Sequence, residues 1–90
     1  MTAPRLSGPE SKLLICLLVF YREIGPGATP GMKGLDEEAG LALHELDEAV
    51  NGLREKGLIE YWELQPAVRL TRDGFFLAQR LSGEAGGWPL

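Results

Sequence analysis

The chain has 90 residues, of which 44% are hydrophobic and 24% are charged, and its formal net charge is −4. This length predicts one domain with a single core, and it excludes a second domain or a deep catalytic cleft beside that core. Because the chain has one cysteine and one histidine, it cannot build a disulfide framework, a multi-cysteine zinc site or a Ser-His-Asp or Cys-His arrangement. We therefore expect no enzyme, no bound metal and no cofactor.

The first segment of the chain, residues 1–10, contains two prolines and a glycine and predicts a flexible arm. Ser11 is a favourable N-cap, so we expect the first helix to span residues 12–24. The Gly-Pro-Gly sequence at residues 25–27 ends that helix, because glycine terminates helices and proline cannot continue them.

The run at residues 13–21 has nine apolar residues, which is far short of the ~20 that span a bilayer, so we expect no membrane segment. As a helix this run is apolar all round, whereas a surface helix normally has one apolar stripe. We interpret the second apolar side as a contact with another copy of the chain. The residues predicted at this homodimer interface are Leu14, Leu18 and Tyr21.

Two short helices follow a loop at residues 26–31. Residues 33–39 predict a second helix that ends at Gly40, and residues 43–56 predict a third. Gly57 is expected to end the third helix in the left-handed conformation. The inward positions recur at helical spacing: Leu41, Leu43, Leu46, Val50 and Leu53.

The pattern then changes to that of a β-hairpin. Residues 58–63 are rich in strand formers, residues 64–66 are a turn, and residues 67–70 return as a second strand. Thr71 is the expected cap of a fourth helix that runs to about Leu81. Its apolar set is Phe75, Leu77, Ala78 and Leu81.

The predicted order is therefore helix, helix, helix, strand, strand, helix. This is a mainly α chain with a small β-hairpin, in the α+β class. Two helices joined by a short turn that contains glycine make a helix-turn-helix. We expect one domain at residues 11–82, with a flexible tail at residues 83–90.

Two stretches of this sequence resemble winged helix-turn-helix regulators of transcription. Residues 35–41 (LDEEAGL) and 46–59, which end in LREKGLI, resemble their helix-turn-helix, and residues 68–74 (VRLTRDG) resemble the L-T-x-x-G that leads from their wing into the last helix. The nearest families are the multiple-antibiotic-resistance regulators (MarR) and small archaeal winged-helix regulators, and the likeness covers residues 12–81. It implies a winged helix-turn-helix fold and binding to double-stranded DNA.

The resemblance also implies which residues would contact DNA, since the third helix of such a fold enters the major groove and the wing contacts the backbone or the minor groove. The outward residues of the third helix would read bases: His44, Glu45, Asp47, Glu48 and Asn51. The residues expected to contact phosphates or to act from the wing are Lys33, Arg54, Gln65, Arg69 and Arg72.

The charge distribution departs from that expectation and keeps a second function open. Residues 34–53 hold six acidic residues and no lysine or arginine, whereas residues 54–80 hold five basic and four acidic residues. Carboxylates beside phosphates weaken binding to DNA at modest salt concentration. The alternative is a winged helix that binds a protein partner through its acidic third helix and does not bind DNA. Either protein would be cytoplasmic, in agreement with a single unpaired cysteine.

Overall fold

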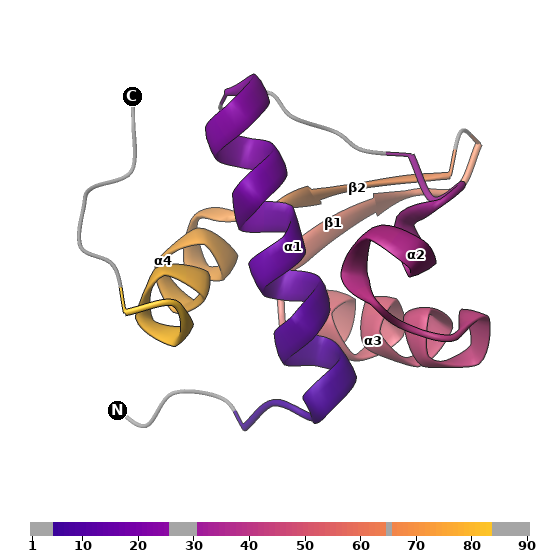
Figure 1. Cartoon of the computed structure of the whole chain (residues 1–90), viewed down its shortest axis with the longest axis horizontal. Coiled ribbons are helices and arrows are strands. Elements are labelled where there is room, and N and C mark those ends of the chain that lie inside the picture. The colour runs from indigo at the N-terminus through magenta and orange to yellow at the C-terminus, as the bar shows by residue number, and fades with distance from the viewer. Residues whose placement is uncertain (1–4, 26–30, 65, 84–90) are drawn as a thin grey trace.

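The computed structural model describes residues 5–25, 31–64 and 66–83 of the chain. Figure 1 shows how its helices and strands are arranged. They are α1 (Gly8–Ile24), α2 (Leu35–Ala39), α3 (Leu43–Glu55), β1 (Ile59–Trp62), β2 (Ala67–Leu70) and α4 (Arg72–Leu81). The predicted order of elements is confirmed, with β2 and α4 at the predicted bounds and α3 within one residue of them.

Helix α1 crosses one face of the hairpin and packs against α3, α4 and β2 (Figure 1). It supplies four leucines to the core: Leu13, Leu14, Leu17 and Leu18. Near the C-terminal end of α1, the centre of the Tyr21 ring lies 4.8 Å from the centre of the Phe75 ring in α4. The helix that looked apolar all round is thus buried mainly by its own chain, and the core forms around it.

The start of α1 corrects the prediction, because the helix begins at Gly8 rather than at residue 12. Ser7, not Ser11, is its N-cap. The backbone N–H of Glu10 donates to Ser7 Oγ at 3.2 Å, and the backbone N–H of Ser7 donates to Glu10 Oε1 at 2.8 Å. This reciprocal pair is a capping box, and Pro9 fits the first turn because the N–H that proline lacks would have no intrahelical partner there. The last residues of the predicted arm therefore belong to the helix.

A partly buried ion pair joins the start of α1 to the end of α3. Lys56 Nζ lies 2.6 Å from Glu10 Oε2, and the Glu10 side chain is 7% exposed. Gly52 makes room for this carboxylate, because a Cβ at that position would collide with Glu10 Oε2. Burial acts to raise the pKa of Glu10, but the hydrogen bonds from Lys56 and Ser7 prevail and hold this pKa below its ordinary value.

The L-T-x-x-G stretch locks α4 onto the turn that follows α3. Thr71 Oγ1 accepts the N–H of Gly74 at 3.1 Å and donates to the Gly57 carbonyl oxygen at 2.7 Å. The N–H of Thr71 donates to the Leu58 carbonyl oxygen at 3.1 Å. Gly74 has to be glycine, because a Cβ there would overlap that same carbonyl. Gly57 has the predicted left-handed conformation, with φ of 73°.

The hairpin is antiparallel, and Ile59 pairs with Leu70 at one end and Trp62 with Ala67 at the other. The segment before α2 joins it, which the sequence did not predict. The N–H of Met32 donates to the Pro66 carbonyl oxygen at 2.9 Å, and Gly31 forms an isolated bridge with Ala67. The chain that leads into α2 is thereby held against the turn end of the hairpin.

Several side chains lie elsewhere than the pattern indicated. Leu43 and Leu81, predicted to face inward, are 69% and 42% exposed. Each stands at an end of its helix, where the neighbouring elements do not reach over it. The three side chains expected at a homodimer interface, Leu14, Leu18 and Tyr21, are buried inside the single chain. A contact between copies along α1 would have to use other residues of that helix.

Candidate nucleic-acid interface

The outward face of α3 carries a compact set of polar side chains. His44, Asp47, Glu48 and Asn51 are all exposed, and their spacing places them on one side of the helix. Neighbouring Leu46, Ala49, Val50 and Leu53 are buried and hold the opposite side against the core. Four of the five residues predicted to read bases are therefore displayed together. These four side chains include two carboxylates and no lysine or arginine.

Glu45, the fifth predicted base reader, is engaged in another way. The backbone N–H of Ala42 donates to Glu45 Oε1 at 2.9 Å. A carboxylate at this position satisfies one of the free N–H groups at the start of the helix and favours the helix dipole. Glu45 is half-buried, and its carboxylate stabilises the N-terminal end of α3. Little in the sequence signals this, because Ala42 at the N-cap position lacks the side-chain oxygen of a usual capping box.

The first residue of α3 adds an apolar side chain to this face. Leu43 is 69% exposed and stands one position before His44. Sequence reasoning placed Leu43 in the core, because it continues the leucine periodicity. The same reasoning began the third helix at this residue, but the burial does not extend to this first position.

Arg69 of β2 and Arg54 of α3 each contact a carboxylate and an aromatic ring. Arg69 Nη2 lies 3.2 Å from Glu60 Oε2, and its guanidinium lies 5.4 Å from the centre of the Trp62 ring. Glu60 and Arg69 are cross-strand partners, so the strand register itself brings them together. Trp62 is the aromatic residue of β1 that faces out, and Tyr61 packs against the core.

Arg54 bridges α3 and the hairpin. Its Nη2 lies 3.5 Å from Glu63 Oε1, and its guanidinium lies 5.7 Å from the centre of the Tyr61 ring. Both partners are well exposed, as are Arg69 and Glu60. Ion pairs of this kind contribute about 0–1 kcal/mol because water screens them. Each arginine can therefore exchange its carboxylate for a phosphate at little cost.

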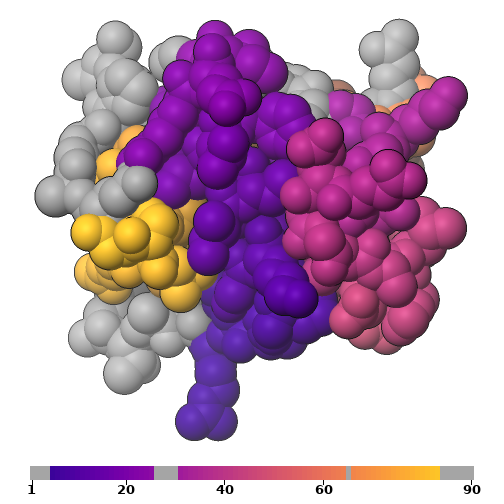
Figure 2. Space-filling view, viewed as in Figure 1, coloured from indigo at the N-terminus to yellow at the C-terminus, as the bar shows by residue number. Residues whose placement is uncertain are grey.

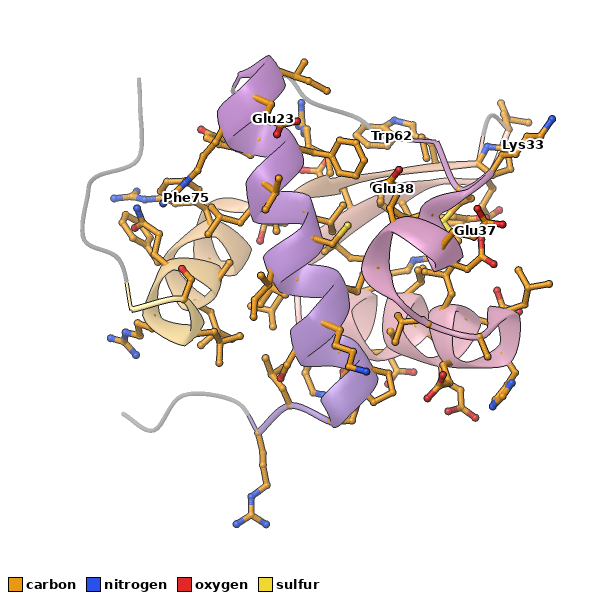
Figure 3. The ribbon with its side chains drawn as sticks, in the orientation of Figure 1. Glu23, Lys33, Glu37, Glu38, Trp62 and Phe75 are labelled. Atoms are coloured by element: carbon orange, nitrogen blue, oxygen red, sulfur yellow. The ribbon has the colours of Figure 1, made fainter. Side chains whose placement is uncertain are left out.

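The remaining predicted contacts lie at opposite ends of the hairpin. Figure 3 shows Lys33 beside the turn between the strands, where the bridge of Gly31 with Ala67 holds its segment. Arg72 follows the other end of β2, and its guanidinium lies 5.8 Å from the centre of the Phe76 ring. The structure thus brings Lys33 to the turn end of the hairpin but not Arg72. Gln65 lies outside the described residues.

Comparison with known proteins identifies the fold. No protein-family model and no curated protein matches the chain. A crystal structure of a MarR family transcriptional regulator from Silicibacter pomeroyi DSS-3 is similar to it, with 24% sequence identity and a TM-score of 0.67. The match covers 87% of this chain. The chain has a winged-helix fold. It spans 53% of the length of that regulator, so the two share the winged helix and not the whole protein.

In this winged helix, α2 and α3 form the helix-turn-helix and the hairpin is the wing. The second helix of this helix-turn-helix is α3, and its exposed polar side chains face away from the core. The described residues contain no group of His, Cys, Asp and Glu arranged to hold a metal ion. No helix within the described ranges is long and apolar enough to cross a membrane.

Proposed function

We propose that the chain is a regulator of transcription that binds double-stranded DNA through the outward face of α3 and the wing. The observation that carries this proposal is the likeness of the fold, over most of the chain, to a MarR family transcriptional regulator. His44 and Asn51 are exposed on α3 and can bond to base edges in the major groove. We also infer that it acts in the cytoplasm and as a homodimer.

The wing would supply the phosphate contacts of the proposed complex. Lys33 extends from the segment bound to the wing turn, and the described residues show no ion pair for it. Arg54 and Arg69 would each leave an exposed carboxylate and turn to a phosphate. Lys56 would not, because its partner Glu10 is buried. The electrostatic footprint would therefore rest on three cations in each subunit.

The carboxylates of α3 would tune the affinity of this complex. Asp47 and Glu48 stand on the face that would enter the groove, where they repel phosphates but can accept a hydrogen bond from cytosine N4. Binding to mixed sequence should thus be weak, with discrimination in favour of sites that place cytosines opposite these two residues.

Fluorescence anisotropy of a labelled mixed-sequence duplex, titrated with the protein at about 50 and 200 mM salt, tests the proposal. With two to three phosphate contacts per subunit, we expect a slope of log affinity against log salt of about −2 to −3 per subunit. Absence of binding at the lower salt concentration would reject a sequence-independent phosphate contact and with it this function.

The charge of α3 favours a second function, that of a module for protein interaction. Leu43, Asp47 and Glu48 together present an exposed apolar side chain beside two carboxylates. This surface complements a partner segment that carries arginine or lysine beside an apolar residue. If duplex DNA does not bind at low salt, then this second function replaces the first.

A further inference from the structure

The outer face of the wing carries a cluster of three side chains, formed by Glu60 and Trp62 of β1 and Arg69 of β2. Ile59 and Val68 in the same strands are buried, and alternation along each strand turns the three to the opposite face. Figure 2 shows that the helices cover most of the hairpin on the side of α1. Trp62 is nonetheless 40% exposed and does not belong to the core cluster. The fold therefore places a tryptophan beside an arginine without using its ring for the core.

The strand register explains why the Trp62 ring meets Arg69. Glu60 is the direct cross-strand partner of Arg69, whereas Trp62 stands opposite Ala67, so that Arg69 is its diagonal neighbour. Diagonal neighbours in an antiparallel pair lie within reach of an aromatic side chain. Because Ala67 is small, it leaves the Trp62 ring room to extend toward Arg69. The guanidinium carbon of Arg69 lies over this ring, 5.4 Å from its centre.

Arg69 offers different parts of its guanidinium to its two partners. Nη2 at the edge of the group lies 3.2 Å from Glu60 Oε2, whereas the central carbon lies over the Trp62 ring. A phosphate binds the N–H groups at the edge, as a carboxylate does, so it would compete with Glu60 for Arg69. It would not compete with Trp62, because a guanidinium that stacks on an aromatic ring keeps its N–H groups available. Trp62 can therefore remain in contact with Arg69 when Glu60 is displaced.

We propose that Trp62 is a positioning residue of the wing, which holds the Arg69 guanidinium in place while a DNA phosphate replaces Glu60. This inference rests on the proposed function, because it states how one cation of the wing is presented to DNA. An arginine side chain loses rotamer freedom when it is fixed on a phosphate, and this loss weakens binding. Trp62 already restricts the side chain before DNA arrives, so less freedom is lost on binding.

Arg54 of α3 has the same two kinds of partner, taken from the next residues of the chain. Its Nη2 lies 3.5 Å from Glu63 Oε1, and its guanidinium carbon lies 5.7 Å from the centre of the Tyr61 ring. The four residues 60–63 thus give each arginine one carboxylate and one ring. Tyr61 also packs against the core, so that its removal would disturb the fold. Trp62 does not pack there, and its substitution leaves the core intact.

Fluorescence anisotropy of a labelled mixed-sequence duplex, titrated with the full chain at about 50 mM salt, measures the effect of Trp62. Trp62→Ala should weaken binding about threefold, because Arg69 must then be ordered at the cost of binding. Trp62→Phe keeps an aromatic ring under the guanidinium and should bind within about twofold of the wild type. Circular dichroism of each variant shows that it is folded.

The matched control is the same substitution in a chain that lacks the arginine. Arg69→Ala should lower the slope of log affinity against log salt by about 0.9 per subunit, as the loss of one phosphate contact does. In the Arg69→Ala chain, Trp62→Ala should then weaken binding less than about 1.5-fold, because no guanidinium is left to position.

A tryptophan that only supported the hairpin, or that touched the DNA itself, would cost the same factor with and without Arg69. Equal losses in the two backgrounds, or no loss from Trp62→Ala in either, would therefore overturn the positioning role and leave the DNA-binding function standing. A wild-type chain that does not bind the duplex would overturn both.

Discussion

Lys56 Nζ lies 2.6 Å from the carboxylate of Glu10 and thereby joins the end of α3 to the start of α1. Glu10 also accepts the backbone N–H of Ser7, so one side chain caps α1 and anchors α3. This pair therefore fixes α3, the helix proposed to enter the groove, on the helix at the centre of the core. It also takes one lysine away from any contact with DNA.

Glu10→Gln should lower the free energy of unfolding at pH 7 by about 1–2 kcal/mol, because glutamine removes the negative charge that pairs with the partly exposed Lys56. The pKa of Glu10 is held below its ordinary value of 4.5 in the folded chain. Its contribution is therefore complete above that pH and is lost as the pH falls through the folded pKa.

Urea denaturation at a series of pH values from neutral to acid checks this prediction. The difference between wild type and Glu10→Gln should be largest at neutral pH and should shrink below pH 4.5. Glu55→Gln, at an exposed position of α3, should differ from the wild type by no more than about 0.5 kcal/mol. A difference for Glu10→Gln that stays constant through the acid range would show that its charge does not stabilise the fold.

Gly74→Ala should destabilise the fold strongly, because the added Cβ would overlap the Leu58 carbonyl and push α4 off the turn after α3. We expect a loss of about 2–3 kcal/mol, typical of overpacking against backbone that cannot shift easily. Gly8→Ala is the control, since a Cβ there meets nothing within 4 Å. Thermal denaturation of the two variants measures the contrast, and equal stability would show that the close packing at Gly74 is not required.

Thr71→Val should cost about 1 kcal/mol or somewhat more, because it keeps the shape of the side chain but removes its oxygen. That oxygen accepts the N–H of Gly74 and donates to the Gly57 carbonyl. Thr71→Ser keeps both hydrogen bonds and should retain most of the stability. If both variants unfold at the same urea concentration, the two hydrogen bonds contribute nothing measurable.

The sequence was sufficient for the order of the elements, because glycines, caps and changes of period mark where they end. Gly57, Thr71 and the strands around the turn each give a local signal of this kind. The start of α1 was placed too late, because Ser11 was predicted to be the cap. Ser7, three residues before Glu10, has the sequence spacing of a capping box, and that signal was missed.

Features that depend on contacts between distant residues could not be predicted. The ion pair of Glu10 with Lys56 and the bridge of Gly31 with Ala67 join residues far apart in the chain. Periodicity also gave no way to tell that the chain itself buries Leu14 and Leu18 whereas Ile15 and Val19 face out. For the candidate site, the sequence indicated which α3 side chains face out, and four of those five are exposed. It did not indicate the ion pairs of Arg54 with Glu63 and of Arg69 with Glu60.

The central claim, that the outward face of α3 lies against DNA, is tested most directly by removing its negative charge. The double variant Asp47→Asn with Glu48→Gln should bind a mixed-sequence duplex about tenfold more tightly at low salt, because two carboxylates no longer repel the phosphates. Asp73→Asn, at an exposed position in the first turn of α4, should change the affinity less than twofold, as expected of a screened surface charge. If the α3 variant and the Asp73 variant bind alike, then α3 does not face the DNA and the account is contradicted.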